Sequence, residues 1–343
     1  TIDVYRGELQ PLRRWIDYLF YVSFFPGLVA GPIVRARDFI PQMFRTPVVT
    51  RETLGEGLYL IICGLLKKSV ISDYISVNFV DRIFDAPTLY TGLENLVGAY
   101  GYALQIYCDF SGYSDMAIGI ALLLGIRFNT NFDSPYQSAT ITEFWRRWHI
   151  SLSTWLKDYL YISLGGNRRG RVRTYVNLML TMLLGGLWHG ASGRFILWGG
   201  LHGAALAVHK FMMNHFPSFR PTGDTMSPLR RVCGVLITFH VVCFGWIFFR
   251  ADTMATGWDV IRQIFTAFHP EVFSQFVVGY TEVFLLILGG YAIHFMPRVV
   301  DTTVRGWVTQ SPTLVQALYL TVAIIIVLQL KSADIVPFIY FQF

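Results

Sequence analysis

Five long stretches of this chain contain no charged residue. Each approaches or exceeds the roughly 17 to 25 apolar residues that a membrane-spanning helix needs. Hydrophobic residues make up 53% of the 343 residues and charged residues only 15%, whereas about 25% of an ordinary soluble domain is charged. Together with several shorter apolar runs, the sequence predicts an all-α, polytopic membrane protein with about eight or nine spanning helices. The five long stretches are residues 18–34, 174–193, 232–249, 283–297 and 306–330.

The net charge is +6, and the basic residues are dispersed between the apolar runs. Positive loops beside membrane helices explain this distribution better than a nucleic-acid-binding surface does. The chain begins with Thr1 and shows no signal-peptide pattern, so we expect it to lack the N-terminal helices of a longer protein. No linker or repeat interrupts it, which predicts a single membrane-embedded domain over residues 1–343. The four cysteines lack metal-ligand spacing, and no metal site is expected.

Two acidic residues interrupt otherwise apolar sequence. Asp109 and Asp115 flank the sequence Phe-Ser-Gly-Tyr-Ser and are bordered on both sides by apolar helical segments. Carboxylates at membrane depth are costly unless they are paired. We therefore expect structural roles for both residues, such as helix caps or pairing with a buried arginine.

The segment 138–166 combines a helical pattern with charge. Thr140 and Glu143 have the spacing of a capping box at its start, and Gly165-Gly166 supplies a stop. Charged residues are expensive in lipid, so this helix is expected to lie at the membrane interface or to line a hydrated cavity. An alternative is an amphipathic interfacial helix with His149 as a polar residue at its edge. An aromatic and apolar stripe recurs at helical spacing through Trp145, Trp148, Leu152, Trp155 and Tyr159.

Four arginines follow this segment, immediately before an apolar run. One interpretation is the positively charged cytoplasmic flank of a membrane helix. The other is a site for the phosphates of an acyl-coenzyme A donor, because arginine pairs bidentately with phosphate oxygens. Both interpretations place this loop in the cytoplasm. The residues are Arg168, Arg169, Arg171 and Arg173.

His189 lies near the far end of the uncharged run 174–193, which is about 30 Å long as a helix. A desolvated histidine is neutral at physiological pH, so His189 could accept a proton from a substrate hydroxyl. The alternative is a histidine that is hydrogen-bonded between helices. His202 and His209 are interpreted as structural. Two small-residue pairs allow backbones to approach closely around His189, namely Gly186 with Gly190 and Gly199 with Gly203.

A series of long motifs in order along the chain resembles the membrane-bound O-acyltransferase family, in particular its bacterial branch of alginate O-acetyltransferase-like proteins. Because the motifs are long and keep their order, the resemblance is highly specific, and it extends from the start of the chain to its terminal Phe-Gln-Phe. The matching motifs are Phe24-Phe25-Pro26 with Ala30-Gly31-Pro32-Ile33, Asp109-Phe110-Ser111-Gly112-Tyr113-Ser114-Asp115, Phe144-Trp145-Arg146-Arg147-Trp148-His149-Ile150-Ser151-Leu152-Ser153, Leu164-Gly165-Gly166-Asn167 and Gly186-Leu187-Trp188-His189-Gly190.

The resemblance implies a helical bundle with a tunnel across the membrane and with re-entrant or interfacial helices. The family has two signature polar positions, an Asn or His followed by a His, and the separation of His149 and His189 matches them. The resemblance thus implies that His189 is the principal catalytic residue and His149 its partner. Residues expected to line the tunnel or to bind substrate are Trp145, Trp148, Ser153 and Trp188.

The implied function is transfer of an acyl group, expected to be acetyl, from a cytoplasmic donor across the bacterial inner membrane. The donor is acetyl-coenzyme A or another acyl thioester, with no bound cofactor. The acceptors are hydroxyls of an exported polysaccharide such as alginate, and a periplasmic acetyltransferase partner is expected to complete the transfer. Alternatives are acyl transfer for peptidoglycan or teichoic acid, and a transporter or flippase with histidines as proton relays. The sequence lacks the paired helix breaks expected of an inverted-repeat carrier.

Overall fold

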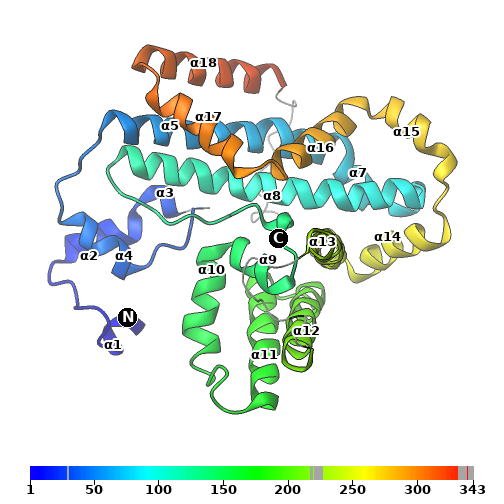
Figure 1. The fold of residues 1–343 in the computed structure, drawn as a ribbon, viewed down its shortest axis with the longest axis horizontal. Helices are drawn as coiled ribbons and strands as arrows, with labels where there is room; N and C mark the ends of the chain where they lie inside the picture. Colours follow the sequence, from blue (N-terminus) through cyan, green and yellow to red (C-terminus); the bar gives the residue numbers. More distant parts are fainter. Residues whose placement is uncertain (29–30, 217–218, 220–226, 331–337, 339–343) are drawn as a thin grey trace. The chain divides into compact units, whose positions relative to one another are not determined.

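The computed structural model describes residues 1–28, 31–216, 219, 227–330 and 338, and all regular secondary structure in them is helical (Figure 1). The all-α prediction is therefore confirmed. The chain divides into two compact units. The first unit comprises Thr1–Val70, Tyr107–Asn131 and Met296–Asp334, and the second comprises mainly Ile71–Ile106 and Phe132–Phe295. The longest helix, α8 (Gly92–Leu123), contributes residues to both units.

The first unit is built around α5, which packs against α17 and α18. The side chain of Thr50 caps the N-terminus of α5 by accepting a hydrogen bond from the Thr53 N–H at 3.2 Å. A small aromatic cluster centred on Phe39 holds the N-terminal helices together. The elements of this unit are α1 (Ile2–Tyr5), α2 (Trp15–Ser23), α3 (Phe25–Leu28), α4 (Ala36–Met43), α5 (Arg51–Leu65), most of the π-helix η1 (Leu66–Ser72), α17 (Arg298–Gln310) and α18 (Thr313–Leu330).

The two aspartates of α8, Asp109 and Asp115, pair with lysines of η1 within the first unit. Lys68 Nζ lies 2.5 Å from Asp109 Oδ1, and their side chains are only 8% and 3% exposed. Lys67 Nζ lies 2.6 Å from Asp115 Oδ2. The predicted structural role of the two carboxylates is confirmed, although the partners are lysines instead of an arginine. Since removal of one partner leaves a buried charge uncompensated, these pairs tie α8 to η1.

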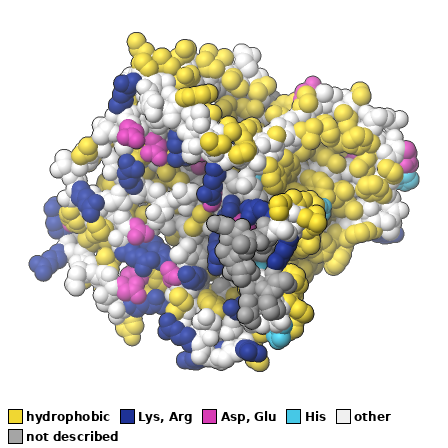
Figure 2. Space-filling model, in the orientation of Figure 1, with side chains coloured by type: hydrophobic (Ala, Val, Ile, Leu, Met, Phe, Trp, Pro, Cys, Tyr) yellow, Lys and Arg dark blue, Asp and Glu magenta, His cyan; other side chains and the backbone are white. Residues whose placement is uncertain are grey.

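Two helices in the described residues are long and apolar enough to cross a membrane, α13 (Pro228–Arg250) and α18. A third candidate is the bent pair Pro270–Gly279 with α16 (Thr281–His294), whose two parts meet at 98°. The apolar side chains of α18 are widely exposed (Figure 2), with Leu314 at 86% and Leu328 at 66%. Lipid is the medium in which such a surface is stable.

This number is smaller than the eight or nine spans that the sequence predicts, and prolines interrupt two of the five long apolar runs. The run 18–34 forms α2 and α3, with Pro26 inside α3, and residues 29 and 30 lie outside the described residues. The run 306–330 is split between α17 and α18 at Pro312. Proline has no N–H to donate to the preceding turn, so an uncharged run need not be one helix.

The second unit contains a layer in which α11 and α12 lie side by side (Figure 1). Its elements are α6 (Asp73–Ile75), the π-helix η2 (Ser76–Val80), α7 (Asp81–Asp85), η3 (Pro87–Leu89), η4 (Pro135–Gln137), α9 (Ile141–Arg147), α10 (Ile150–Trp155), the π-helix η5 (Leu156–Tyr161), α11 (Arg171–His189), α12 (Gly193–His215), α13, α14 (Met254–Thr266), η7 (Pro270–Val272), α15 (Phe273–Gly279) and α16.

Glycines allow the backbones of α11 and α12 to touch, as the sequence predicts. A β-carbon at Gly186 would lie 2.2 Å from the carbonyl oxygen of Phe195, and one at Gly199 would lie 2.3 Å from that of Met182. Both separations are far below van der Waals contact, so neither position can carry a side chain without moving the backbone. This contact sets the position of the C-terminal end of α11, where His189 lies.

Replacement of Gly199 by Ala is expected to destabilise the protein by about 1–3 kcal/mol, because the added methyl group overpacks the contact between α11 and α12. The neighbouring Gly200 is a matched control, since a β-carbon there would meet its nearest atom at 3.6 Å. Gly200→Ala should leave stability unchanged or raise it by up to about 1 kcal/mol through helix propensity. Thermal unfolding in detergent measures both variants, and equal melting temperatures would contradict the prediction.

Candidate functional site

The segment 138–166 is not the single helix that the sequence predicts. It forms α9, α10 and η5 with a break between the first two. At the break, Trp148 is extended and His149 adopts a left-handed backbone conformation, with φ 42° and ψ 56°. Helix periodicity therefore does not continue through the segment, and the predicted aromatic stripe is divided between separate environments.

The predicted boundaries of this segment are confirmed. The Thr140 hydroxyl accepts a hydrogen bond from the Glu143 N–H at 3.1 Å, which caps α9. The Glu143 carboxylate accepts the Ala139 N–H at 2.9 Å and pairs with Arg147 at 2.8 Å. The predicted stop contains two glycines with positive φ, and Gly165 has φ 105°. The charges of Glu143 and Arg147 are thus compensated locally, which reduces their cost in a poorly hydrated environment.

His149 is held at the break by contacts on several sides. It is only 3% exposed. Its ring stacks against Phe132 with a centroid separation of 6.3 Å, and its Nδ1 lies 3.4 Å from the Ser151 hydroxyl. Because His149 lies between α9 and α10, it is outside the candidate membrane spans. Burial lowers the pKa of His149, and the proximity of His189 lowers it further. The imidazole is therefore neutral at pH 7.

His189 is the last residue of α11 and lies in an aromatic enclosure. Its ring centroid is 5.0 Å from that of Trp188, 5.1 Å from that of Trp198 and 5.1 Å from that of Phe249. These rings come from α11, α12 and α13 respectively. His189 lowers the pKa of His149, so the two histidines lie within range of an electrostatic interaction.

The residues predicted to line a tunnel lie in different surroundings. Trp148 is 2% exposed and packs against Trp246 at 5.0 Å, whereas Trp145 packs against Trp198 at 5.8 Å. Trp188 is 56% exposed. The Ser153 hydroxyl donates a hydrogen bond to the Trp148 carbonyl at 3.0 Å, so it stabilises the break beside His149.

All four predicted phosphate-binding arginines are exposed and cluster around the start of α11. Arg171 and His189 are the first and last residues of this helix, so about 27 Å of helix separates them. The arginines therefore cannot contact the atoms around His189. In the described part of the chain, no group of three or more His, Cys, Asp and Glu is placed to hold a metal ion.

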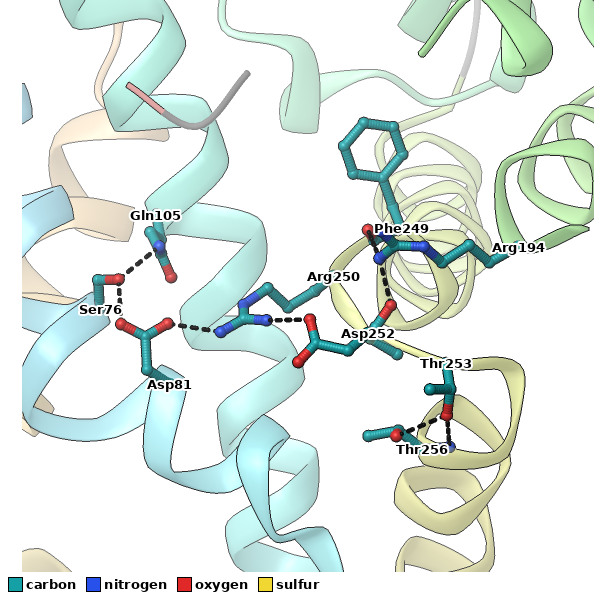
Figure 3. Close-up of polar contacts among 10 residues, drawn as sticks. Ser76, Asp81, Gln105, Arg194, Phe249, Arg250, Asp252, Thr253 and Thr256 are labelled. Atoms are coloured by element: carbon teal, nitrogen blue, oxygen red, sulfur yellow. Dashed lines mark hydrogen bonds and ion pairs between the residues drawn. The ribbon is translucent and has the colours of Figure 1, made fainter. Parts of the chain in front are cut away.

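A polar network fixes the C-terminal end of α13 next to His189 (Figure 3). Arg194, from the start of α12, donates hydrogen bonds to the backbone carbonyls of Phe249 and Ala251. Arg250 pairs with Asp81 at 2.8 Å and with Asp252 at 3.6 Å. The network thereby anchors the backbone that carries the Phe249 ring of the enclosure.

The network continues into the helices on the other side of Asp81. The Ser76 hydroxyl donates to the Asp81 carboxylate at 2.7 Å, and the Gln105 amide donates to Ser76 at 2.8 Å (Figure 3). Because Ser76 belongs to η2 and Gln105 to α8, three separate segments support the guanidinium of Arg250. Such a supported charge holds its neighbours in one arrangement.

Several residues of this site are not predicted from the sequence, among them Trp198, Arg194 and Arg250. Both arginines are the first charged residue after a long uncharged run. That position is typical of the charged flank of a membrane helix. The sequence therefore does not indicate the hydrogen bonds and ion pairs that these arginines form. Trp198 has no local signal, because a tryptophan in an apolar helix is ordinarily a packing residue.

A family model described as the membrane-bound O-acyltransferase family, MBOAT, matches residues 13–267. This range covers most of the chain and includes both histidines of the site. The protein belongs to the membrane-bound O-acyltransferase family.

Particular relatives share large parts of the sequence. A probable alginate O-acetylase AlgI of Azotobacter vinelandii is 46% identical over 265 residues, which are 77% of this chain and 51% of the relative. One of Pseudomonas putida is 38% identical over 363 aligned residues, covering 100% of this chain and 72% of the relative. A peptidoglycan O-acetyltransferase of Helicobacter pylori is 39% identical over 305 residues, 88% of this chain and 54% of the relative. The chain thus spans about half the length of the Azotobacter and Helicobacter proteins.

The left-handed backbone at His149 limits which residues fit there. Asn, Asp and His tolerate this conformation best among residues other than glycine, whereas β-branched residues do not. Asn is the alternative residue that the family resemblance gives for this position, and it satisfies the same backbone requirement. The conformation of the break thus accounts for the choice between Asn and His in physical terms.

Replacement of His149 by Asn is therefore expected to cost less stability than replacement by Thr, a residue of similar size to Asn. The expected difference in the free energy of unfolding is about 1–2 kcal/mol, because Thr is β-branched and strains the left-handed conformation. Both variants lose the same aromatic contact with Phe132, so this loss cancels in the comparison. Thermal or denaturant unfolding in detergent measures the difference, and a Thr variant as stable as the Asn variant would refute the backbone explanation.

Proposed function

We propose that this protein is an O-acyltransferase that moves an acetyl group from a cytoplasmic acyl thioester, such as acetyl-coenzyme A, toward hydroxyls of an exported polysaccharide. Alginate is the proposed acceptor, in line with the names of the Azotobacter and Pseudomonas relatives. The observation that carries the proposal is the position of His189 among the rings of Trp188, Trp198 and Phe249, within electrostatic range of the buried His149. Membership of the family supplies the reaction class.

His189 is proposed as the general base. It would take the proton from the acceptor hydroxyl as the hydroxyl oxygen attacks the thioester carbonyl carbon. His149 is proposed to hydrogen-bond the donor or the acceptor, since its imidazole is neutral and can both donate and accept. The rings of Trp188, Trp198 and Phe249 would limit access of water to the acyl group, which disfavours hydrolysis of the donor.

The positions of the arginines support an extended donor. Guanidinium groups at the start of α11 suit the phosphates of coenzyme A, while the thioester reaches the histidines at the other end of this helix. Coenzyme A has this form, because its phosphates and its thiol lie at opposite ends. We propose that the donor enters along α11 from the cytoplasmic side, through a tunnel to which Trp145, Trp148, Ser153 and Trp188 contribute.

The proposal includes the place of the protein in the cell. The family is membrane-bound. We propose that this protein lies in the bacterial inner membrane and crosses it several times. A separate periplasmic acetyltransferase is proposed to receive the acetyl group and to complete its transfer. Residues 1–343 are proposed to act as one membrane-embedded acyltransferase domain.

Replacement of His189 by Ala is expected to reduce acetyl transfer by about 10²- to 10⁴-fold, because the general base is lost. Membranes containing the protein are supplied with radiolabelled acetyl-coenzyme A and the exported polysaccharide fraction, and label in the polysaccharide is measured. His215→Ala is a matched control, since His215 is exposed and, among the described residues, hydrogen-bonds to Phe211 of its own helix. Undiminished transfer at a normal protein level would remove His189 from this role and favour the transporter interpretation.

Replacement of the four arginines by Gln is expected to raise KM for acetyl-coenzyme A with little change in kcat, because they are remote from the acyl carbon. The effect should shrink at high salt, since exposed charges are screened. Acetyl-pantetheine, which lacks the nucleotide phosphates, serves as the control donor and should react equally with both proteins. A fall in kcat with an unchanged KM would count against phosphate binding. The four positions are Arg168, Arg169, Arg171 and Arg173.

A further inference from the structure

The ring of His202 is oriented by a hydrogen bond from a neighbouring tryptophan. Trp145 Nε1 lies 3.3 Å from His202 Nδ1. An indole nitrogen can only donate, so Nδ1 must be the acceptor. An imidazole that accepts at Nδ1 is neutral and carries its proton on Nε2. His202 therefore presents an N–H donor at Nε2, although the sequence suggests only a structural role for it.

This donor and one other are buried without an acceptor. His202 is 1% exposed and Trp198 is 2% exposed. Neither His202 Nε2 nor Trp198 Nε1 has a hydrogen-bond partner among the residues that the structure describes. A buried hydrogen-bond donor without an acceptor destabilises the fold by about 1–3 kcal/mol. These two donors belong to neighbouring side chains. The ring centroids of the two residues are 4.8 Å apart.

The His202 and Trp198 side chains both pack against Gly245 of α13. A β-carbon at Gly245 would lie 3.2 Å from His202 Nε2 and 3.3 Å from Trp198 Cδ1, the carbon bonded to Nε1. Because residue 245 is glycine, no side chain from this position lies against His202 Nε2. The proposed general base is adjacent, since the ring of His189 lies 5.1 Å from that of Trp198.

We infer that His202 Nε2 and Trp198 Nε1 form an oxyanion-binding site for the acyl group during transfer. This inference rests on the proposed function and makes His202 and Trp198 catalytic residues in addition to the two predicted histidines. The ligand is the carbonyl oxygen of an acyl thioester, which gains negative charge in the transition state. Donors that are already in place and kept from water stabilise such charge strongly.

Atoms and electrons are conserved in the proposed transfer of the acyl group from sulfur to oxygen. The acceptor hydroxyl oxygen forms a bond to the acyl carbon and gives its proton to His189, while the π-electron pair of the carbonyl moves to its oxygen. The two N–H groups hold this oxyanion. When the pair returns, the carbon–sulfur bond breaks, and the thiolate leaves and takes the proton from His189. An oxygen ester and a thiol are the products.

Trp198→Phe is the first test, because it removes one N–H and keeps an aromatic ring. It is expected to lower kcat for acetyl transfer by about 10²- to 10³-fold, the usual effect of losing one oxyanion-site donor. Trp246→Phe is the matched control, since Trp246 is also buried but its Nε1 already donates to Tyr136 at 3.2 Å. The control should lose more thermal stability and much less activity than Trp198→Phe.

A second measurement separates charge stabilisation from a packing role. Two acyl donors are compared, acetyl-coenzyme A and its dithioester analogue. In the analogue, sulfur replaces the carbonyl oxygen and accepts hydrogen bonds poorly. The wild type should strongly prefer the oxygen compound, and Trp198→Phe should lose most of that preference. A packing defect would slow both donors equally. Gly245→Ala, which covers His202 Nε2 with a methyl group, should also weaken the preference.

The outcomes distinguish this inference from the proposed function on which it rests. Transfer by the wild type that is lost in His189→Ala establishes the proposed function in the same assay. If Trp198→Phe then keeps the wild-type rate, or slows both donors equally, the oxyanion site is overturned and the proposed function stands. If the wild type transfers no acetyl group, the proposed function and the oxyanion site are both overturned. A selective loss of the oxygen preference supports the site.

Discussion

The direct backbone contact between α11 and α12 is the constraint on which the candidate site depends. Gly186 and Gly199 remove the side chains that would separate the two helices, so carbonyl oxygens of one helix reach the α-carbons of the other. His189 at the end of α11 is thereby brought beside Trp198 of α12. In a membrane, where burial of apolar surface gives little drive for helices to associate, close packing of this kind is a main source of attraction between them.

Charge plays a supporting part at the edges of this packed region. Arg194 holds the last turn of α13, and Arg250 ties that turn to Asp81 and Asp252. Each guanidinium serves several acceptors at once, which suits the planar geometry of arginine. The enclosure around His189 is therefore apolar inside and anchored by polar contacts outside.

Much of the fold was predictable where local patterns decide structure. Thr140 caps its helix, glycine ends the following segment, and α13 forms where an uncharged run predicts a span. The break at His149 was not predictable, because its neighbours keep helical periodicity while tertiary contacts, such as that with Phe132, hold the left-handed residue in place. The division of other apolar runs was not predictable for a similar reason. Hydrophobicity indicates that a segment is buried in lipid or protein, but it does not show whether the segment is one continuous helix.

The sequence alone determined that this chain is a helical membrane protein of one family, and it singled out His149 and His189. Composition and motif order are properties of the chain itself, so no structure was needed for these conclusions. Only the tertiary structure decided which groups surround the histidines. The neutral form of His202 depends on Trp145, and its buried Nε2 lies against Gly245, although these residues lie on three different helices. Hydrogen-bond partners set protonation and orientation, and partners distant in sequence are established only by folding.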